Sequence, residues 1–249
     1  MTLYMHAFAP DAGRLMRYAS RERLLPPGGD LGYALHAALT GTFGDSAPKP
    51  FIWCAPGTRS GGDHGRILCY SVRTLDVLLA HANAFAESTV AALLNLPSSE
   101  SKEMPASFDV GSRLGFRVRI RPVLRTGKSR DGTGGKERDA YIENTSADGC
   151  ESDRSQCYVR WLETQMAEGG ARLERASLES FSLTRLATRD RSGTKSRRDA
   201  PTGPDAVATG TLDVADAARF STLLSRGIGR FRAFGFGMLL LAPARKERN

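Results

Sequence analysis

The arrangement of apolar and polar residues along the chain predicts a mixture of strands and helices. Strands are expected where apolar residues occupy every second position, and helices where they recur at steps of three to four residues. In the first half of the chain, this pattern predicts strands at residues 3–9, 51–55, 67–72 and 89–94, and helices at 31–43 and 75–85. Residues 97–107 are rich in Ser, Glu and Pro, and this composition predicts a linker.

The second half repeats the same order of elements. Strands are predicted at residues 115–124, 173–186, 209–214 and 238–241, and helices at 156–168 and 215–226. Polar, Gly-rich stretches predict an insertion or a mobile loop at 125–155 and a loop at 189–206. The order β-α-β-β-α-β is typical of ferredoxin-like domains. We therefore expect an α+β fold with tandem ferredoxin-like (RRM-like) domains at 1–107 and 108–249, although no sequence repeat relates the two halves.

The predicted helix at 31–43 presents two polar side chains on one flank. Asp30 precedes this helix and can cap its first turn. Leucines at four-residue steps face the core, which leaves Tyr33 and His36 together, because residues three apart share a helix face. A His beside a Tyr on a helix is more often structural than catalytic. His6, His64 and His81 have even less local support as catalytic residues.

The predicted strand that begins the second half carries arginine on alternate positions. Arg117, Arg119 and Arg121 share one face, while the apolar residues between them point the other way. Their spacing would be about 6.6–6.8 Å, so three guanidiniums could each offer a fork to successive phosphates. The alternative is a solvated edge that uses arginine for solubility. We favour the phosphate contact, because like charges in register repel one another.

A Gly-rich segment at 227–237, with the sequence GIGRFRAFGFG, follows a predicted helix and precedes a strand. This order is the reverse of a dinucleotide-binding motif, and the G-K-[ST] ending of a P-loop is missing, so no nucleotide cofactor is expected. Its glycines would let the backbone approach a ligand closely. Its arginines add charge and its phenylalanines offer stacking faces, unless they only pack the loop against the sheet.

Charge makes a polyanion the first partner to consider. The chain has 249 residues with 35 Lys and Arg against 27 Asp and Glu, a net charge of +8.

The four cysteines of the chain form no C-x-x-C pair and have no His at zinc-ligand spacing, which predicts a reducing compartment without structural zinc. No signal peptide or apolar span is recognisable, so a cytoplasmic protein is expected. No cluster of carboxylates suggests a magnesium site, and we predict neither a metal nor any other cofactor.

Several of these segments together resemble one family. The C-terminal sequence from Gly227 to Pro243 resembles the terminal Gly-rich loop of RAMP-superfamily CRISPR-associated proteins, and is most similar to the repeat-processing nuclease of subtype I-E. The Tyr33-x-x-His36 helix resembles the catalytic helix of that family. Further similarity lies at 116–122 and at Trp161-Leu162-Glu163, which is followed by two glycines. The matches occur in the expected order along nearly the whole chain.

The resemblance implies tandem ferredoxin-like domains and metal-free cleavage of CRISPR repeat RNA at the base of a hairpin. The products would carry a 2′,3′-cyclic phosphate and a 5′-hydroxyl. The enzyme would stay on the crRNA hairpin and join other CRISPR effector subunits. His36 would be the general acid–base and Tyr33 its partner. The long insertion and the arginines before the catalytic helix instead resemble the type IV enzyme, in which Arg23 would supply charge.

The sequence also leaves open a non-catalytic RAMP-type subunit that binds guide RNA in an effector complex. Only Tyr33, His36 and the nearby arginines distinguish the nuclease from this alternative. A generic RNA-binding module is disfavoured by the Gly-rich segment. The residues expected to bind RNA under the preferred reading are Arg14, Arg17, Arg21, Arg117, Arg119, Arg121, Arg125, Lys128, Arg130, Gly227, Gly229, Arg230, Phe231, Arg232, Gly235 and Gly237.

Overall fold

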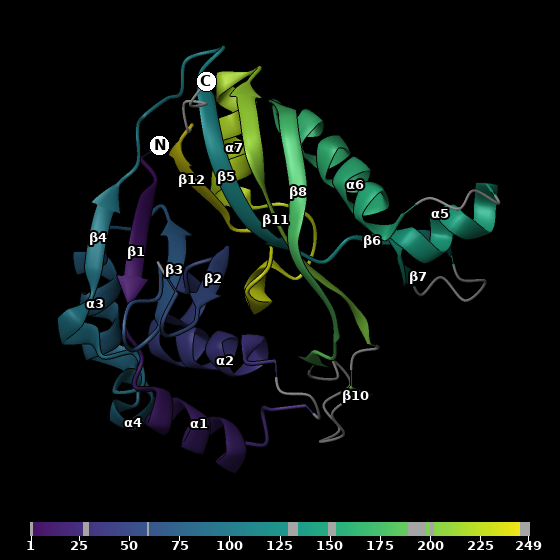
Figure 1. The fold of residues 1–249 in the computed structure, drawn as a ribbon. Coiled ribbons are helices and arrows are strands. Elements are labelled where there is room, and N and C mark those ends of the chain that lie inside the picture. The colour runs from purple at the N-terminus through teal and green to yellow at the C-terminus, as the bar shows by residue number, and fades with distance from the viewer. Residues whose placement is uncertain are drawn as a thin grey trace.

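Two four-stranded antiparallel sheets form the framework of the protein (Figure 1). The computed structural model describes residues 2–26, 30–58, 60–128, 134–148, 153–188, 198–199 and 202–244. One sheet belongs to the first half of the chain and the other to the second half. The predicted α+β fold with tandem ferredoxin-like domains is confirmed.

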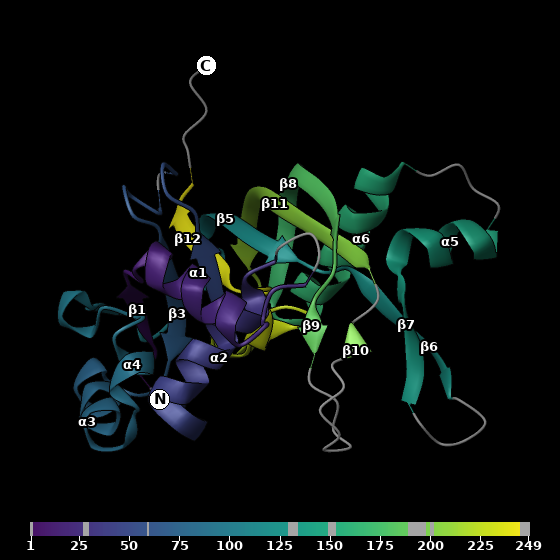
Figure 2. The ribbon, with the colours of Figure 1, turned by 90° about the horizontal axis from the view of Figure 1, so that it is seen from below.

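The first sheet has the strand order β2-β3-β1-β4. Its elements are β1 Tyr4–Phe8, α1 Ala12–Arg21, α2 Gly32–Phe43, β2 Phe51–Cys54, β3 Arg66–Ser71, α3 Leu75–Phe85, α4 Ser88–Ala91 and β4 Glu100–Glu103, with 3₁₀ turns η1 Gly44–Ser46 and η2 Leu96–Ser98. Helices α2 and α3 pack their buried residues, including Leu35, Leu39 and Leu78, with Phe8 and Phe51 of the strands. In the view from below, α1 and α2 lie next to each other (Figure 2).

The second sheet repeats the arrangement with the order β12-β5-β11-β8. Its elements are β5 Arg113–Ile120, α6 Arg154–Glu168, β8 Ala171–Thr184, β11 Gly203–Val214, α7 Ala217–Arg226, η3 Arg232–Phe234 and β12 Leu239–Pro243, with the two-residue strands β9 Ala187–Thr188 and β10 Arg198–Asp199. Buried side chains of α6 and α7, such as Leu162 and Phe220, pack with Val118 and Leu212 of the strands.

The two halves share one apolar core. Ile52, Cys54 and Tyr70 of the first sheet belong to the same buried cluster as the core of the second half. The Tyr70 hydroxyl donates a hydrogen bond to the carbonyl oxygen of Leu239 over 2.9 Å, and burial raises the pKa of this phenol. A buried hydroxyl needs such a partner, so this bond helps to set how the halves sit against each other.

The last strand of the first sheet lies where the sequence predicted a linker. The prediction of a strand at 89–94 is wrong, because α4 and a turn occupy that segment, and β4 forms at Glu100–Glu103. Its four side chains are exposed, so the strand has no apolar alternation to reveal it. Only backbone pairing with β1 defines it. The domain boundary at 107/108 falls in the following connection and stays a prediction.

The insertion predicted as a loop at 125–155 is largely structured. It contains the hairpin β6 Val123–Lys128 and β7 Gly134–Asp139, followed by α5 Ala140–Asp148. The Arg154 guanidinium lies 4.2 Å from the ring centre of Tyr141 and 4.7 Å from that of Phe181, and pairs with Asp139 at 3.0 Å. Long-range packing of this kind is not visible in local composition.

Other boundaries also differ from the prediction. The strand predicted at 115–124 is divided, because β5 ends at Ile120 and residues 123–124 already belong to β6. Strand β11 begins at Gly203, six residues before the predicted start at 209 and inside the predicted loop 189–206. Residues 189–197 and 200–201 of that loop lie outside the described residues. The basic segment before residue 26, which carried no prediction of regular structure, forms α1, and the Asp11 side chain caps it by accepting from the Arg14 backbone N–H.

Candidate functional site

The two candidate catalytic side chains pack against the Gly-rich loop. Tyr33 and His36 of α2 have ring centres 6.1 Å apart. The Phe234 ring, in the turn η3, stacks on Tyr33 at 5.9 Å and meets His36 edge-on at 5.1 Å. Figure 2 shows the yellow C-terminal segment beside α2. The fold therefore joins the N-terminal helix and the C-terminal loop, which are about 200 positions apart in the sequence, into one site.

Close backbone approach explains why α2 starts with glycine. A Cβ at Gly32 would collide with the carbonyl oxygen of Phe234. Asp30 does not occupy the N-cap position, which is Leu31 and has no side-chain cap, but its carboxylate accepts a hydrogen bond from the N–H of Gly32, the first residue of α2, over 2.7 Å. Behind this first turn, Leu35 and Leu39 are buried as their spacing predicted. The flank with Tyr33 and His36 is half-buried and faces the loop.

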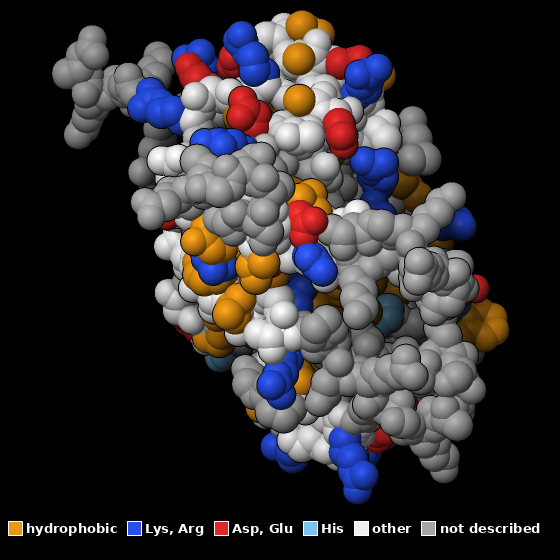
Figure 3. Space-filling model, turned by 90° about the vertical axis from the view of Figure 1, so that its right-hand side faces the viewer, with side chains coloured by type: hydrophobic (Ala, Val, Ile, Leu, Met, Phe, Trp, Pro, Cys, Tyr) orange, Lys and Arg blue, Asp and Glu red, His pale blue; other side chains and the backbone are white. Residues whose placement is uncertain are grey.

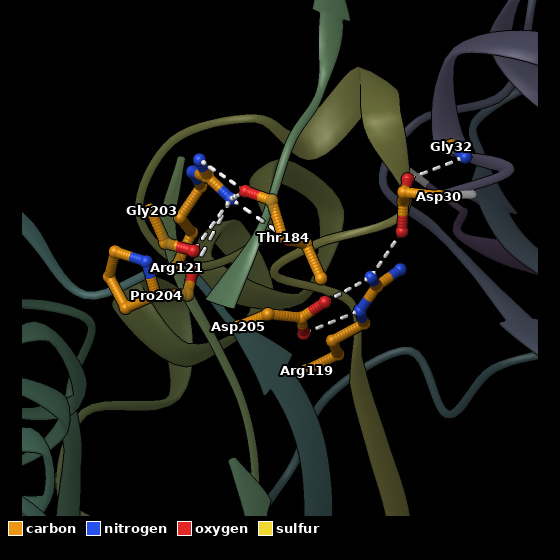
Figure 4. A network of polar contacts seen from close by, with 8 residues as sticks. All are labelled: Asp30, Gly32, Arg119, Arg121, Thr184, Gly203, Pro204 and Asp205. Atoms are coloured by element: carbon orange, nitrogen blue, oxygen red, sulfur yellow. Dashed lines mark hydrogen bonds and ion pairs between the residues drawn. The ribbon is translucent and has the colours of Figure 1, made fainter. Parts of the chain in front are cut away.

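Arg117 and Arg119 of β5, and Arg121 directly after it, do alternate with buried apolar residues, but they do not form a row of open cations. Arg119 pairs with Asp30 and Asp205, each at 2.5 Å (Figure 4). Arg121 is only 4% exposed and donates to Thr184 and to the carbonyl oxygens of residues 203 and 204. Arg117 is more open and forms a two-pronged pair with Glu179 at 2.8 and 3.1 Å.

The three arginines therefore do not form the row of similar, exposed cations that the sequence predicted. Burial lowers the pKa of the Arg121 guanidinium, and the nearby carboxylates of Asp205 and Glu137 oppose that effect. A cation held among carbonyl oxygens and aromatic rings is committed to the fold. Of the three, Arg117 is the one whose side chain reaches solvent most. Direct contact of these residues with RNA stays a prediction.

The glycines of the loop at 227–237 are required by close approach. Gly227, Gly229, Gly235 and Gly237 all have positive φ angles, which favour glycine. A Cβ at Gly229 would collide with the Trp161 ring, and one at Gly237 would collide with the Ile228 carbonyl oxygen. The glycines therefore fold the loop onto itself and onto α6. Their contact with RNA stays a prediction.

The loop borders an open, basic groove. Its lining residues are Lys49, Glu137, Ser225, Arg226, Gly229, Arg230, Phe231, Arg232, Ala233 and Phe234. Glu137 is its one acidic lining residue within the described part of the chain, and it pairs with Arg230. Arg232 donates to the carbonyl oxygen of Arg226 over 2.8 Å. Phe231 adopts a left-handed conformation with φ 61°, which is strained for an aromatic residue, so the loop holds this ring against its backbone preference.

A second basic surface lies on α1. Arg14, Arg17 and Arg21 are exposed and line a groove together with Tyr18 and residues of α4. Figure 3 shows Lys and Arg side chains at the lower end of the molecule, the end at which Figure 1 places α1. Arg14 and Arg21 each have a local acidic neighbour at 3.8 and 3.0 Å, which for exposed pairs contributes little.

Arg23 follows α1 by two residues and adopts an unusual conformation. Its backbone N–H donates to Ser20, and the Leu24 N–H donates to Ala19, so the helix closes in a Schellman motif. Arg23 occupies the left-handed position of this motif with φ 52°, where glycine is preferred. Its side chain is exposed, while the next residue, Leu24, packs in the small cluster that includes Tyr33.

The remaining basic candidates lie on the β6–β7 hairpin. Arg125 is exposed and stands opposite Glu137 in the register of the two strands. Lys128 lies at the end of β6, where only its backbone is described, and Arg130 lies outside the described residues. The hairpin is tied to the Gly-rich loop through the Arg230–Glu137 pair. RNA contact by these three residues stays a prediction.

Burial sets the protonation of His36. Loss of solvent lowers the pKa of its imidazole below the usual 6.5, and the positive charge of Lys49 lowers it further. The Nδ1 atom lies 3.4 Å from the Thr40 hydroxyl oxygen. At neutral pH the ring is therefore largely neutral and able to accept a proton.

Replacing Lys49 with Gln is expected to raise the pKa of His36, because a nearby positive charge disfavours the imidazolium. An NMR titration of the His36 ring should place its midpoint below 6.5 in the unaltered protein and closer to 6.5 in Lys49→Gln. Lys102→Gln also removes one positive charge, but from β4, and serves as the control. An equal His36 midpoint in all three proteins would contradict this electrostatic coupling.

His6 has hydrogen-bond partners inside the protein. It is fully buried between the Ser101 hydroxyl and the Arg73 carbonyl oxygen, each at 3.0 Å, and burial lowers its pKa.

Within the described residues, no group of three or more His, Cys, Asp or Glu side chains could hold a metal ion. No helix in the described part of the chain is long and apolar enough to cross a membrane.

Sequence reasoning missed three residues that shape the site. Lys49 and Glu137 line the groove, and Asp205 holds Arg119. None belongs to a motif, since each is brought in from a separate strand or turn. Asp30 was predicted as a cap, but its second role as the partner of Arg119 has no signal in the sequence.

The chain folds into two ferredoxin-like domains, and one flank of α2 packs against a basic Gly-rich loop. The family of CRISPR-associated proteins matches residues 14–243. The chain belongs to this family. No curated protein matches the chain by sequence.

Solved structures share the fold along nearly the whole chain. CRISPR endoribonuclease Cse3 bound to a 19-nucleotide RNA is 20% identical with a TM-score of 0.63, covering 98% of this chain and 100% of that one. Thermus thermophilus Cse3, bound to an RNA representing a pre-cleavage complex, is 19% identical with a TM-score of 0.59, covering 98% and 100%. A chain of a pre-nicking CRISPR RNA-guided surveillance complex is 18% identical with a TM-score of 0.55, covering 97% and 100%.

Proposed function

We propose that this protein is a metal-independent endoribonuclease that cuts CRISPR repeat RNA at a hairpin to make mature guide RNA. The observation that carries the proposal is the packing of Tyr33 and His36 against Phe234, beside a groove lined by arginines. Membership of the CRISPR-associated family and the likeness to RNA-bound Cse3 support the choice of substrate.

The reaction uses the RNA's own 2′-hydroxyl as nucleophile. The 2′ oxygen attacks the adjacent phosphorus, its proton passes to a base, and the bond from phosphorus to the 5′ oxygen breaks. The departing 5′ oxygen takes up a proton, which leaves a 2′,3′-cyclic phosphate and a 5′-hydroxyl. Neutral His36 acts in proton transfer and Tyr33 orients it or shares the proton. Arg23 stabilises phosphate charge, since an arginine stays protonated.

The groove and the basic surfaces hold the RNA. Arg226, Arg230 and Arg232 neutralise phosphates along the groove, and Phe231 offers a face for base stacking. The arginines of α1 extend the positive surface beyond the groove. Binding should therefore weaken steeply as salt rises.

Retention on the product and assembly with CRISPR effector subunits form the second part of the proposal. The likeness to a chain of an RNA-guided surveillance complex and to Cse3 in RNA complexes supports it. The reaction would take place in the cytoplasm.

The test is incubation of the pure protein with end-labelled repeat RNA from its own locus in EDTA. We expect one cut, with a cyclic phosphate on the upstream fragment and a 5′-hydroxyl on the downstream fragment. Chelation does not slow this reaction, because side chains supply the proton transfers and the charge. Tight binding without cleavage, with and without magnesium, would instead indicate the non-catalytic RAMP-type RNA-binding subunit. A cut that needs magnesium would contradict the mechanism.

A further inference from the structure

Arg119 contacts both halves of the candidate site and the sheet beneath it. Its guanidinium reaches Asp30 at the start of α2 and Asp205 on β11, each at 2.5 Å. It also lies 4.2 Å from the ring centre of Phe236 in the Gly-rich loop. Its backbone carbonyl accepts a hydrogen bond from the Gly237 N–H over 2.7 Å. One residue of β5 thus contacts the segment just before α2 and the end of the loop.

The Asp30 carboxylate uses its two oxygens for different tasks. Oδ1 accepts from the N–H of Gly32, the first residue of α2, over 2.7 Å, while Oδ2 accepts from Arg119 (Figure 4). The helix that carries Tyr33 and His36 is therefore fixed at its start to a strand of the other half. Rotation or sliding of α2 would break both the hydrogen bond from Gly32 to Asp30 and the ion pair between Asp30 and Arg119.

Little solvent reaches the charged groups of this network, so they interact strongly with one another. The side chains of Arg119, Asp30 and Asp205 are 18%, 7% and 9% exposed. Burial alone would lower the pKa of Arg119, but the hydrogen bonds and charges of Asp205 and Asp30 outweigh it and raise that pKa. Removing one partner would leave a buried charge uncompensated, so the arrangement holds as a unit.

We propose that Arg119 and Asp30 are positioning residues that hold the Tyr33–His36 flank in register with the Gly-rich loop. The proposal rests on the proposed nuclease function for its catalytic consequence. It gives Arg119 a role different from direct phosphate binding, since the guanidinium's Nε and Nη2 donate to carboxylates. Rates of reaction are sensitive to shifts of about 1 Å in such constellations.

The same strand offers a matched control. Arg113 also bridges two carboxylates, Glu174 at 2.6 Å and Asp213 at 3.3 Å. Its side chain is 56% exposed, and both of its partners belong to the second sheet. Arg113 therefore matches Arg119 in chemistry but does not bridge to α2 or the loop through these pairs.

The experiment compares Arg119→Lys and Asp30→Asn with Arg113→Lys in the full chain. Lysine keeps the charge but cannot present a planar fork to two carboxylates. Asparagine retains an oxygen for the Gly32 N–H and loses the charge that attracts Arg119. Three quantities are measured: the single-turnover cleavage rate, the Kd for uncut repeat RNA, and hydrogen exchange of the peptides covering 30–36 and 227–237.

We expect Arg119→Lys and Asp30→Asn to slow cleavage by about 10- to 100-fold, with Kd changed by less than about threefold. Both should speed hydrogen exchange in both peptides, whereas Arg113→Lys should leave rate and exchange as they are. Unchanged exchange in the two peptides would overturn the proposal. Weaker RNA binding at an unchanged cleavage rate would also overturn it and restore Arg119 as a phosphate contact. Should the unaltered protein fail to cut, the nuclease proposal falls, while the exchange measurement still decides the positioning role.

Discussion

His36→Ala is expected to slow cleavage of repeat RNA by about 100- to 10,000-fold, the range that positioned proton transfer contributes. The imidazole is half-buried against Phe234 and largely neutral, which suits it to accept the 2′ proton. Its loss removes that step but none of the groove arginines, so the Kd for RNA should stay nearly constant. Single-turnover rates at saturating protein, with Kd from a separate filter assay, measure the two effects.

The variant Arg23→Gly tests whether His36 is the main catalytic residue. Arg23→Gly removes the guanidinium and relaxes the left-handed position, so it should not lower stability. Under the His36 mechanism this variant cuts within about tenfold of the unaltered protein, while His36→Ala loses more. If Arg23→Gly nearly abolishes cleavage and His36→Ala has little effect, an arginine-based site is indicated and our assignment of His36 is wrong.

Gly237→Ala is expected to destabilise the protein by about 3 kcal/mol. A side chain at this positive φ costs about 1–2 kcal/mol. In addition, its Cβ would collide with the Ile228 carbonyl oxygen. The loop must then strain or break the bonds from the Ile228 N–H to Gly237 and from the Gly237 N–H to Arg119, each worth about 1 kcal/mol. Urea unfolding gives this free energy from the midpoint and slope.

Gly111 provides the comparison for Gly237→Ala. It also has a positive φ, 86°, but it is exposed and a Cβ there would meet nothing within 4 Å. Gly111→Ala should therefore cost only the conformational term of about 1–2 kcal/mol and leave RNA binding unchanged. Gly237→Ala should also weaken RNA binding, because the loop bordering the groove is displaced. Equal losses of stability in the two variants would show that close packing at Gly237 is unimportant.

Patterns with a strong local signal were predicted well. The leucine spacing of α2 depends on contacts within one helix turn and the core beneath it. Asp30 does bond the first N–H of this helix, although the N-cap position is Leu31. The predicted helix at 75–85 matches α3 in both bounds. The glycines at 227–237 were predicted to let the backbone approach a ligand closely, and the structure shows that this backbone closely approaches Trp161 and Ile228 of the protein itself.

Features that depend on partners distant in the chain were missed. Strand β4 has four exposed side chains and exists only through its pairing with β1, so no apolar alternation marks it. The β6–β7 hairpin was predicted as a loop because its polar composition hides strands that pair with each other. Arg119 and Arg121 looked alike in the sequence, yet one joins two carboxylates and the other donates to threonine and carbonyl oxygens.

The sequence by itself determined the class of fold, the basic character, the α2 helix and the Gly-rich loop, because these follow from periodicity, charge and the special conformations of glycine. Only the tertiary structure brought Phe234 into contact with both Tyr33 and His36, and only it joined Asp30, Arg119 and Asp205. Such contacts link residues that are roughly 90 to 200 positions apart, and their existence depends on how two sheets pack. Local patterns carry no information about that packing, which sets the geometry of the proposed reaction.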